Sequence, residues 1–278
     1  MIEVTDRATA RQALADVGNR AADLIESMHD TTRVVPGLTW TTLDVASHMV
    51  IAVRGFTDSL TGRALSMAAH IPDVDGYAQR MGAMTSSTLQ AEPRRDPATL
   101  AALLRELLSD FLRESEARAP DERVPTPWYA PDASLSVDQA TRLLTGEMWI
   151  HGYDVARGLN RPWPLDGPTA LQIIPGFLGV VPHAFRPELA RGFSAVVRVR
   201  IRGGNDYGWR FQNGTFEVAP WGTWGERRDV TLSAEPVAFL LLGYGRRSQW
   251  PLIASGRLLS YGRKPWLAPK LVSYFANA

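Results

Sequence analysis

The 278-residue sequence contains no cysteine, which excludes disulfide bonds, thiolate metal sites and a catalytic cysteine nucleophile. Any chemistry that needs a reactive sulfur must therefore take it from a bound small molecule. Lysine is nearly absent as well, since only Lys264 and Lys270 are lysines among the 30 basic residues. This preference for arginine, together with abundant alanine, indicates a coding bias and carries no information about a site.

Blocks of one charge and long apolar runs are also missing. The net charge is +1, and acidic and basic residues are interspersed, so no nucleic-acid partner is predicted. No run approaches the length of a membrane span, and the first residues, MIEVTDRATARQ, lack the apolar region of a signal peptide. We therefore expect a soluble, cytoplasmic protein without a membrane partner, and the sequence leaves its oligomeric state open.

The composition does supply a large core, because 45% of the 278 residues are hydrophobic. The length favours two domains. Helical periodicity runs through the first half, and a two-residue alternation appears after the linker-like segment RPWPLDGP. We predict an α+β protein with a helical bundle over residues 1–162 and a smaller α+β domain over residues 163–278.

Five segments of the first half carry apolar residues at helical spacing. The second segment begins with Thr41 and Asp44, spaced as in a capping box, and this start fixes which face of the helix is buried. His48 lies on that face, where a lone histidine is usually part of the core. The four prolines of residues 120–136 predict a loop. The helices, which would form a four-helix bundle with side branches, are expected over residues 6–29, 41–56, 77–89, 97–118 and 137–160.

The second half begins with an apolar segment over residues 169–185, interrupted by proline, which predicts a helix. Residues 194–204 then alternate with period two, and Asn213-Gly214 between apolar residues is a strong hairpin signal. A further strand is predicted over residues 229–234 and a helix over 235–245. Residues 254–262 predict a short strand or turn, and residues 265–278 a closing helix.

The stretch LLTGEMWIHGYDVARG, residues 143–158, differs from plain scaffold. Glu147 and His151 lie four positions apart, so they project from one helical face, at positions where its apolar stripe should continue. One helix can offer a metal two ligands in this way, although a buried, mutually satisfied Glu–His pair explains the spacing equally simply. Gly146 and Gly152 weaken the helix, so another group is expected to approach closely there.

Two motifs, WTTLDVASHM and GEMWIHGYDVARGLNRPWPL, resemble the mycothiol-dependent maleylpyruvate isomerase family within the DinB-like group of metal-binding helix bundles. The segments DVTLSAEPVAFLLLGYGRR, ASGRLLSYG and KLVSYFANA are similar to the sterol-carrier-like domain that often follows such a bundle. The resemblance implies a DinB-like four-helix bundle, a divalent metal and mycothiol or a similar thiol as cofactors. It also implies that His48, Glu147 and His151 are the metal ligands.

Two imidazoles and one carboxylate suit a borderline ion such as Zn²⁺, and three protein ligands leave positions open for a thiol or substrate. Asp154, one turn after His151, could hold the second ring nitrogen of that histidine or cap a neighbouring helix. Arg246 matches the family's Gly-Arg segment and could clamp a substrate carboxylate, or it could be an ordinary surface arginine. Four aromatic residues could line an apolar pocket or fill the core: Trp128, Tyr129, Trp149 and Trp163.

These features favour a metal- and thiol-dependent enzyme that acts on a small, possibly anionic molecule. The resemblance implies cis–trans isomerisation of the maleylpyruvate type, but transfer of the thiol to an electrophile competes with it. Residues 67–87 form an insertion that changes the edge of the expected cleft, which leaves the substrate open. A non-catalytic carrier of an apolar molecule is the main alternative, and a regulatory or partner-binding protein is a third.

Overall fold

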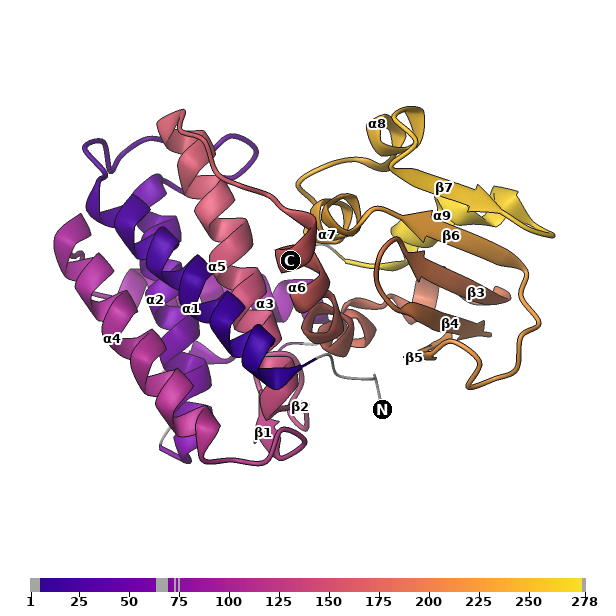
Figure 1. Ribbon diagram of the computed structural model, residues 1–278, viewed down its shortest axis with the longest axis horizontal. Coiled ribbons are helices and arrows are strands. Elements are labelled where there is room, and N and C mark those ends of the chain that lie inside the picture. Colours follow the sequence, from indigo (N-terminus) through magenta and orange to yellow (C-terminus); the bar gives the residue numbers. More distant parts are fainter. Residues whose placement is uncertain (1–5, 64–69, 73, 75, 277–278) are drawn as a thin grey trace.

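The computed structural model describes residues 6–63, 70–72, 74 and 76–276. Within this part of the chain, helices fill the first half, and a five-stranded sheet with short helices fills the second (Figure 1). The α+β fold class predicted from the sequence is confirmed. Part of the predicted insertion, residues 67–69, 73 and 75, lies outside the described residues, as do the first five residues of the chain.

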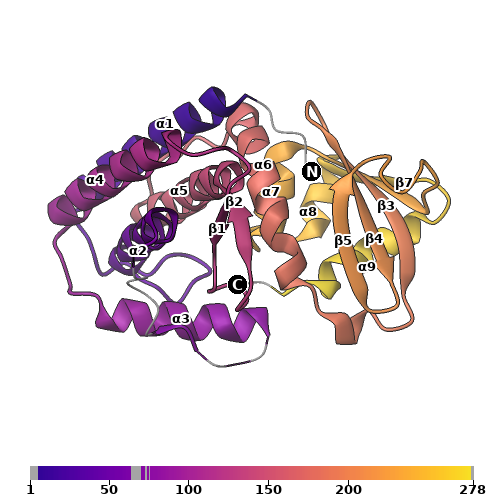
Figure 2. The ribbon, with the colours of Figure 1, turned by 90° about the horizontal axis from the view of Figure 1, so that it is seen from below.

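A four-helix bundle forms the first half. Helices α1 and α2 each pack against both α4 and α5, so the four surround one core. Helix α3 lies outside this ring beside α2, along the lower edge of the view in Figure 2 and opposite α1 and α4. The apolar stripes predicted from the sequence face inward; Leu14, Leu104 and Phe111, for example, are completely buried. The helices are α1 (Arg7–Glu26), α2 (Thr42–Thr61), α3 (Tyr77–Ala91), α4 (Pro97–Glu116) and α5 (Val137–Leu159).

The segment predicted as a loop over residues 120–136 is partly β-structure, which corrects that prediction. Strands β1 (Arg123–Pro125) and β2 (Ser134–Ser136) pair antiparallel. Proline is tolerated here because Pro125 ends a short strand of a two-stranded ladder, where no further strand needs its missing N–H. The ladder holds the intervening residues 126–133 against the bundle, where Trp128 and Tyr129 are buried.

Helix α6 (Gly167–Val180) joins the two halves by packing against α5 on one side and α7 (Pro236–Gly243) on the other. Gly176 allows the close approach to α5, because a Cβ atom there would lie 2.6 Å from the backbone nitrogen of Leu143. The fully buried Arg142 of α5 binds Asp138 and the side chain of Gln172 in α6. The predicted boundary between residues 162 and 163 falls in the segment between α5 and α6 and stays a prediction.

The sheet of the second half has the strand order β5-β4-β3-β6-β7. Strands β3 and β6 run parallel, and the other neighbours are antiparallel. Asn213 and Gly214 both have positive φ and join β4 to β5, which confirms the predicted hairpin. The strands are β3 (Ser194–Ile201), β4 (Asp206–Gln212), β5 (Thr215–Pro220), β6 (Val230–Ala234) and β7 (Leu258–Tyr261).

One face of the sheet turns toward α7 and α6. The alternation in β3 buries Val197 and Val199 completely, and Trp209 of β4 stacks near Phe239 of α7, with 6.3 Å between ring centroids. Phe177 of α6 continues this contact, at 6.0 Å from Phe239. Helix α6 therefore covers α7, which in turn covers the sheet, and the two halves share one continuous core.

The end of the chain differs from the prediction of a closing helix. Residues 265–274 form only one α-helical turn, α9 (Ala268–Leu271), between two 3-10 turns (Pro265–Leu267 and Val272–Tyr274). Pro265 and Pro269 interrupt a longer helix, and Phe275 instead forms a β-bridge with Phe185 inside an aromatic cluster. Helix α8 (Gln249–Ala254) was not predicted. Among the described residues, no helix is long and apolar enough to cross a membrane.

Candidate metal centre

Two capped helices position three potential ligands. The predicted capping box at the start of α2 is present, since the Thr41 hydroxyl accepts from the Asp44 backbone N–H and the Asp44 carboxylate accepts from that of Thr41. Ser136 begins α5 with a second capping box. The two caps fix the rotation of their helices, so that His48 of α2 faces Glu147 and His151 of α5.

The three side chains converge on one point. Glu147 Oε2 lies 3.6 Å from His48 Nε2 and 3.3 Å from His151 Nε2, and one ligand atom from each residue lies within 4.8 Å of the others. All three side chains are largely buried, with 10 to 18% of their surface exposed. Buried polar groups of this kind are costly unless they are paired, and here Glu147 contacts both histidines.

A second layer of polar groups stands behind His151. Its Nδ1 lies 3.2 Å from Asp154 Oδ2, and Asp154 is completely buried. A carboxylate only accepts hydrogen bonds, so Nδ1 carries the proton and Nε2 points toward Glu147. Arg246, from the segment after α7, donates to both Asp154 oxygens at 2.6 to 3.2 Å and to the carbonyl oxygen of Tyr244 at 2.7 Å. The structure thus joins two predicted site residues, Asp154 and Arg246, that lie 92 positions apart.

The charges of the three candidate ligands are set by these contacts. Burial lowers the pKa of His48, so its imidazole is neutral near pH 7. Burial acts in the same direction on His151, but hydrogen bonds to Asp154 and Glu147 outweigh it and raise its pKa to about 9. Burial would raise the pKa of Glu147, yet its contacts with His151 and His48 hold that pKa far below the usual range. Without a metal, the site at pH 7 is therefore a carboxylate facing an imidazolium.

The residues fit a divalent ion. A tetrahedral ion with bonds of about 2.0–2.1 Å keeps its ligand atoms roughly 3.4 Å apart. The distances from Glu147 Oε2 to the two histidine nitrogens match that spacing. Two imidazoles with one carboxylate are also the donor set of catalytic zinc sites that leave a position open. Asp154 supplies the outer carboxylate that commonly orients a ligating histidine.

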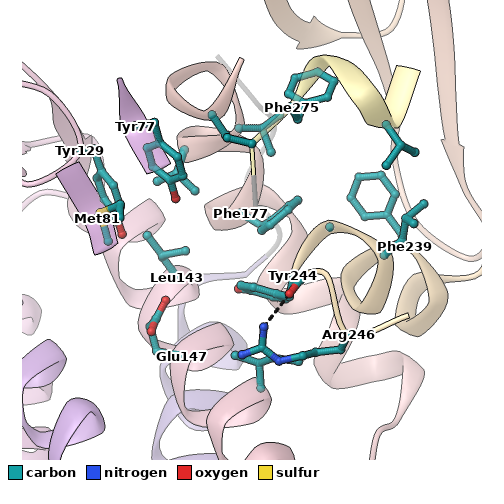
Figure 3. A pocket seen from close by; sticks show the side chains of 18 of the residues that line it. Tyr77, Met81, Tyr129, Leu143, Glu147, Phe177, Phe239, Tyr244, Arg246 and Phe275 are labelled. Carbon is teal, nitrogen blue, oxygen red and sulfur yellow. Dashed lines mark hydrogen bonds between the residues drawn. The ribbon is translucent and has the colours of Figure 1, made fainter. Parts of the chain in front are cut away.

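The three candidate ligands lie on the wall of a cavity of about 560 Å³. Figure 3 shows Glu147 on one side of this space and Arg246 on the other, with Tyr244 next to Arg246 and Phe177 beyond Tyr244. Trp40 lies against both histidine rings, with 5.2 Å between its centroid and that of His48. The cavity therefore gives a small molecule direct access to the three ligand side chains.

A model of the mycothiol maleylpyruvate isomerase N-terminal domain matches residues 7–156, just over half of the chain. The chain belongs to the mycothiol maleylpyruvate isomerase family. Two solved structures of the mycothiol-dependent maleylpyruvate isomerase, one of them a histidine-to-alanine variant, are similar to it with TM-scores of 0.51. Their sequences are 13% and 11% identical to this one, over 92% of this chain and 93% of theirs, so the likeness shows a shared fold. No curated protein matches the chain.

In this member of the mycothiol maleylpyruvate isomerase family, the two glycines of α5 next to the ligands confirm the predicted close approaches. A Cβ atom at Gly146 would lie 2.3 Å from the Tyr244 hydroxyl oxygen, and one at Gly152 would lie 2.2 Å from the Trp163 ring. Trp163 also donates from Nε1 to the Trp149 carbonyl oxygen at 2.9 Å. Gly146 therefore makes room for the C-terminal half beside Glu147, and Gly152 for the segment after α5.

The other residues considered from the sequence lie in the cavity lining, in the core or outside both. Trp128 and Tyr129 line the cavity, whereas Trp149 is completely buried in the bundle. His29 is exposed. His70 Nδ1 lies 2.8 Å from the Ser87 hydroxyl oxygen, away from the three ligands, and His183 stacks on Tyr129 with 6.1 Å between centroids.

Many cavity residues were not predicted from the sequence, among them Trp40, Tyr77 and Tyr244. Burial and the nearby negative charge of Glu147 raise the pKa of both tyrosines, so their hydroxyl groups stay protonated. The sequence contained a signal for Trp40 and for Tyr244. Trp40 directly precedes the capping box that orients His48, and Tyr244 is two positions before Arg246.

Proposed function

We propose that this chain is an enzyme that depends on a divalent metal, with zinc the best fit, and on a low-molecular-weight thiol such as mycothiol. The observation that carries the proposal is the convergence of His48, Glu147 and His151 on a cavity wall, in a protein without cysteine. Family membership supports the same reaction class.

His48, Glu147 and His151 would hold the metal. A divalent ion bound there would favour the deprotonation of a thiol bound to it. Asp154 fixes the protonated nitrogen of His151 and keeps the other nitrogen directed at the site. Trp40 lies against both histidine rings and would limit the access of water on that side.

Arg246 would bind the substrate's anionic group. A guanidinium has five N–H groups on three nitrogens. The hydrogen bonds of Arg246 to Asp154 and to the Tyr244 carbonyl oxygen use one N–H group of each nitrogen. The two remaining N–H groups can pair with a carboxylate or with an oxygen that becomes negative during the reaction. We assign the metal wall to residues 1–162 and the Arg246 wall to residues 163–278.

Thiolate addition explains both candidate reactions. Sulfur bonds to the β-carbon of an unsaturated carbonyl compound, and the electron pair of the double bond moves onto the carbonyl oxygen as an enolate. Rotation about the new single bond and loss of the thiolate give the trans isomer and return the thiol. Protonation of the α-carbon instead leaves a thioether, which is transfer. Arg246 would stabilise the enolate in both cases.

Elemental analysis of the purified protein tests the metal site. We expect about one divalent ion per chain after dialysis. His151→Ala should abolish loading, and His29→Ala, which changes an exposed histidine, should retain it. A wild-type protein that stays metal-free after incubation with zinc, nickel and manganese would contradict the proposal.

Calorimetry with mycothiol, on metal-loaded and metal-stripped protein, tests the thiol. Tighter binding to the loaded protein supports activation at the metal, and equal affinity refutes it. The size of the cavity also favours a second candidate, a carrier of an apolar molecule. Binding of fatty acids without any effect of thiol would support the carrier.

A further inference from the structure

The cavity has two chemically different ends. On the bundle side, its lining combines apolar residues such as Phe56 and Met81 with five residues that carry hydroxyl groups: Thr39, Thr85, Thr88, Tyr77 and Tyr129. Toward the sheet the lining is almost entirely apolar and aromatic, with side chains from α6, β4, β6, α7, β7 and the C-terminal segment. They include Phe177, Trp209, Leu232, Phe239, Leu242, Leu258, Leu271 and Phe275. Figure 3 shows Phe177, Phe239 and Phe275 on this side.

The charge of the lining limits what the apolar end can hold. Among the described residues that line the cavity, Arg246 is the only arginine or lysine, and Glu147 is the only carboxylate. Arg246 is already bound by Asp154. A small dicarboxylate would place one carboxylate near Arg246 and the metal ligands, but its second carboxylate would meet no cation in the rest of the cavity. Burying an unpaired charge there costs several kcal/mol or more.

The apolar end also reaches the surface. Ile253 of α8, Leu259 of β7 and Val272 line the cavity, and each is between 37 and 44% exposed. Exposed large apolar side chains around a cavity opening are typical of a binding site for an apolar molecule. Such a molecule could enter between α8, β7 and the C-terminal segment and reach Glu147 without passing the hydroxyl-lined end.

We propose that the substrate of the thiol reaction is an unsaturated carbonyl compound with a single acidic group and an apolar body. Its acidic, unsaturated head lies between Arg246 and the metal ligands, and its tail extends along Phe177 and Phe239 toward the sheet. The polar thiol occupies the hydroxyl-lined end beside α3. In the reaction, sulfur bonds to the β-carbon and the proton of the thiol goes to the α-carbon or returns to the departing sulfur, so no other reagent is needed. This assignment rests on the proposed function.

Zinc-loaded protein should be tested with cis- and trans-4-oxo-2-alkenoic acids whose tails range from methyl to nonyl, each carrying one carboxylate. Binding is measured by calorimetry on the saturated analogues. Mycothiol-dependent isomerisation is measured on the cis enones, and mycothiol consumption on both series. Affinity should rise by up to about fourfold per methylene until the apolar end is filled. The matching enone with a second carboxylate in place of the tail should bind at least tenfold more weakly than the nonyl compound.

Two variants place a negative charge in the apolar end. Leu242→Glu lies inside it, and Leu259→Glu lies at its exposed rim, where folding should tolerate the change. Each should weaken binding of the nonyl analogue tenfold or more and leave the methyl analogue unchanged. Leu189→Glu, an exposed leucine away from the cavity, is the matched control and should change neither.

The outcomes separate the two proposals. Thiol consumption that is fastest with the dicarboxylate and independent of tail length would overturn the substrate assignment but leave the proposed function standing. Binding that grows with tail length, with neither mycothiol-dependent isomerisation of any cis enone nor consumption of thiol by any enone, would overturn the proposed function, and the assignment with it. Growth in both affinity and thiol consumption with tail length supports both.

Discussion

Asp154→Asn is the sharpest test of the polar layer behind the metal site. The Asp154 side chain is fully buried and accepts from His151 Nδ1 and twice from Arg246. Asparagine has one accepting oxygen, and its NH₂ group would face donors of His151 or Arg246. Loss of an outer carboxylate of this kind commonly weakens metal binding about 10- to 100-fold, or roughly 1–3 kcal/mol.

The effect should depend on pH, because Asp154 helps to hold a proton on His151. With a pKa of about 9 in the metal-free protein, His151 must lose that proton before it can bind a metal at pH 7. Proton competition therefore weakens the wild-type affinity about 100-fold at pH 7 relative to pH above 9. Protons compete less strongly with zinc in the variant, so we expect its zinc affinity to depend less steeply on pH. The difference in zinc affinity between the wild type and the variant should be largest near pH 9.

Zinc affinity should be measured by competition with a chromophoric chelator at pH 7, 8 and 9. Thermal unfolding in EDTA should show a separate loss of stability of about 3 kcal/mol, because the variant leaves Arg246 without its buried partner. Asp166→Asn, at the start of α6, is the matched control, since asparagine caps a helix as well as aspartate does. Wild-type affinity and wild-type pH dependence in Asp154→Asn would refute the role given to this carboxylate.

Three further changes give distinct results. In the wild type, calorimetry at pH 7 in buffers of different ionisation enthalpy should show about one proton released per zinc, because His151 is protonated in the metal-free protein. The free energy of unfolding of the metal-free protein should fall between pH 6.5 and 9, because the raised pKa of His151 stabilises the fold only while His151 is protonated. Gly146→Ala should cost about 1–3 kcal/mol in chemical denaturation by displacing Tyr244, and Gly82→Ala, with open space around its Cβ position, should not. Arg246→Ala should lower turnover on the order of a hundredfold with zinc content near one, whereas Arg247→Ala at the exposed neighbouring position should have little effect.

Local signals predicted much of the bundle and the hairpin. The capping box at Thr41 and the helical spacing of Glu147 and His151 are short-range patterns, and they correctly indicated which face of each helix is buried. Asn213-Gly214 specified its turn because few residue pairs accept positive φ at both positions. In these places, the information lies within one or two turns of the chain.

Contacts between distant segments could not be predicted in the same way. Gly146 indicated that a group approaches α5, but nothing in the sequence named Tyr244 as that group. The bond between Asp154 and Arg246 joins positions 92 residues apart. From the sequence alone, Asp154 could equally have capped a helix, and Arg246 could have been an ordinary surface arginine. The prediction of a closing helix was wrong for a related reason, because Tyr274 and Phe275 pack against aromatic residues that lie far away in the sequence, such as Phe193 and Phe216.

The ion pair between Asp154 and Arg246 also connects metal binding with the packing of the second half of the chain against the helix bundle. Asp154 belongs to α5 and Arg246 follows α7, so whatever strengthens the contact of His151 with Asp154 also holds α7 against the bundle. Thermodynamic linkage makes this relation reciprocal. A metal-loaded protein should then protect the backbone amides of α7 from hydrogen exchange more strongly than a stripped one, and a ligand that tightens the packing of α7 should slow the escape of the ion.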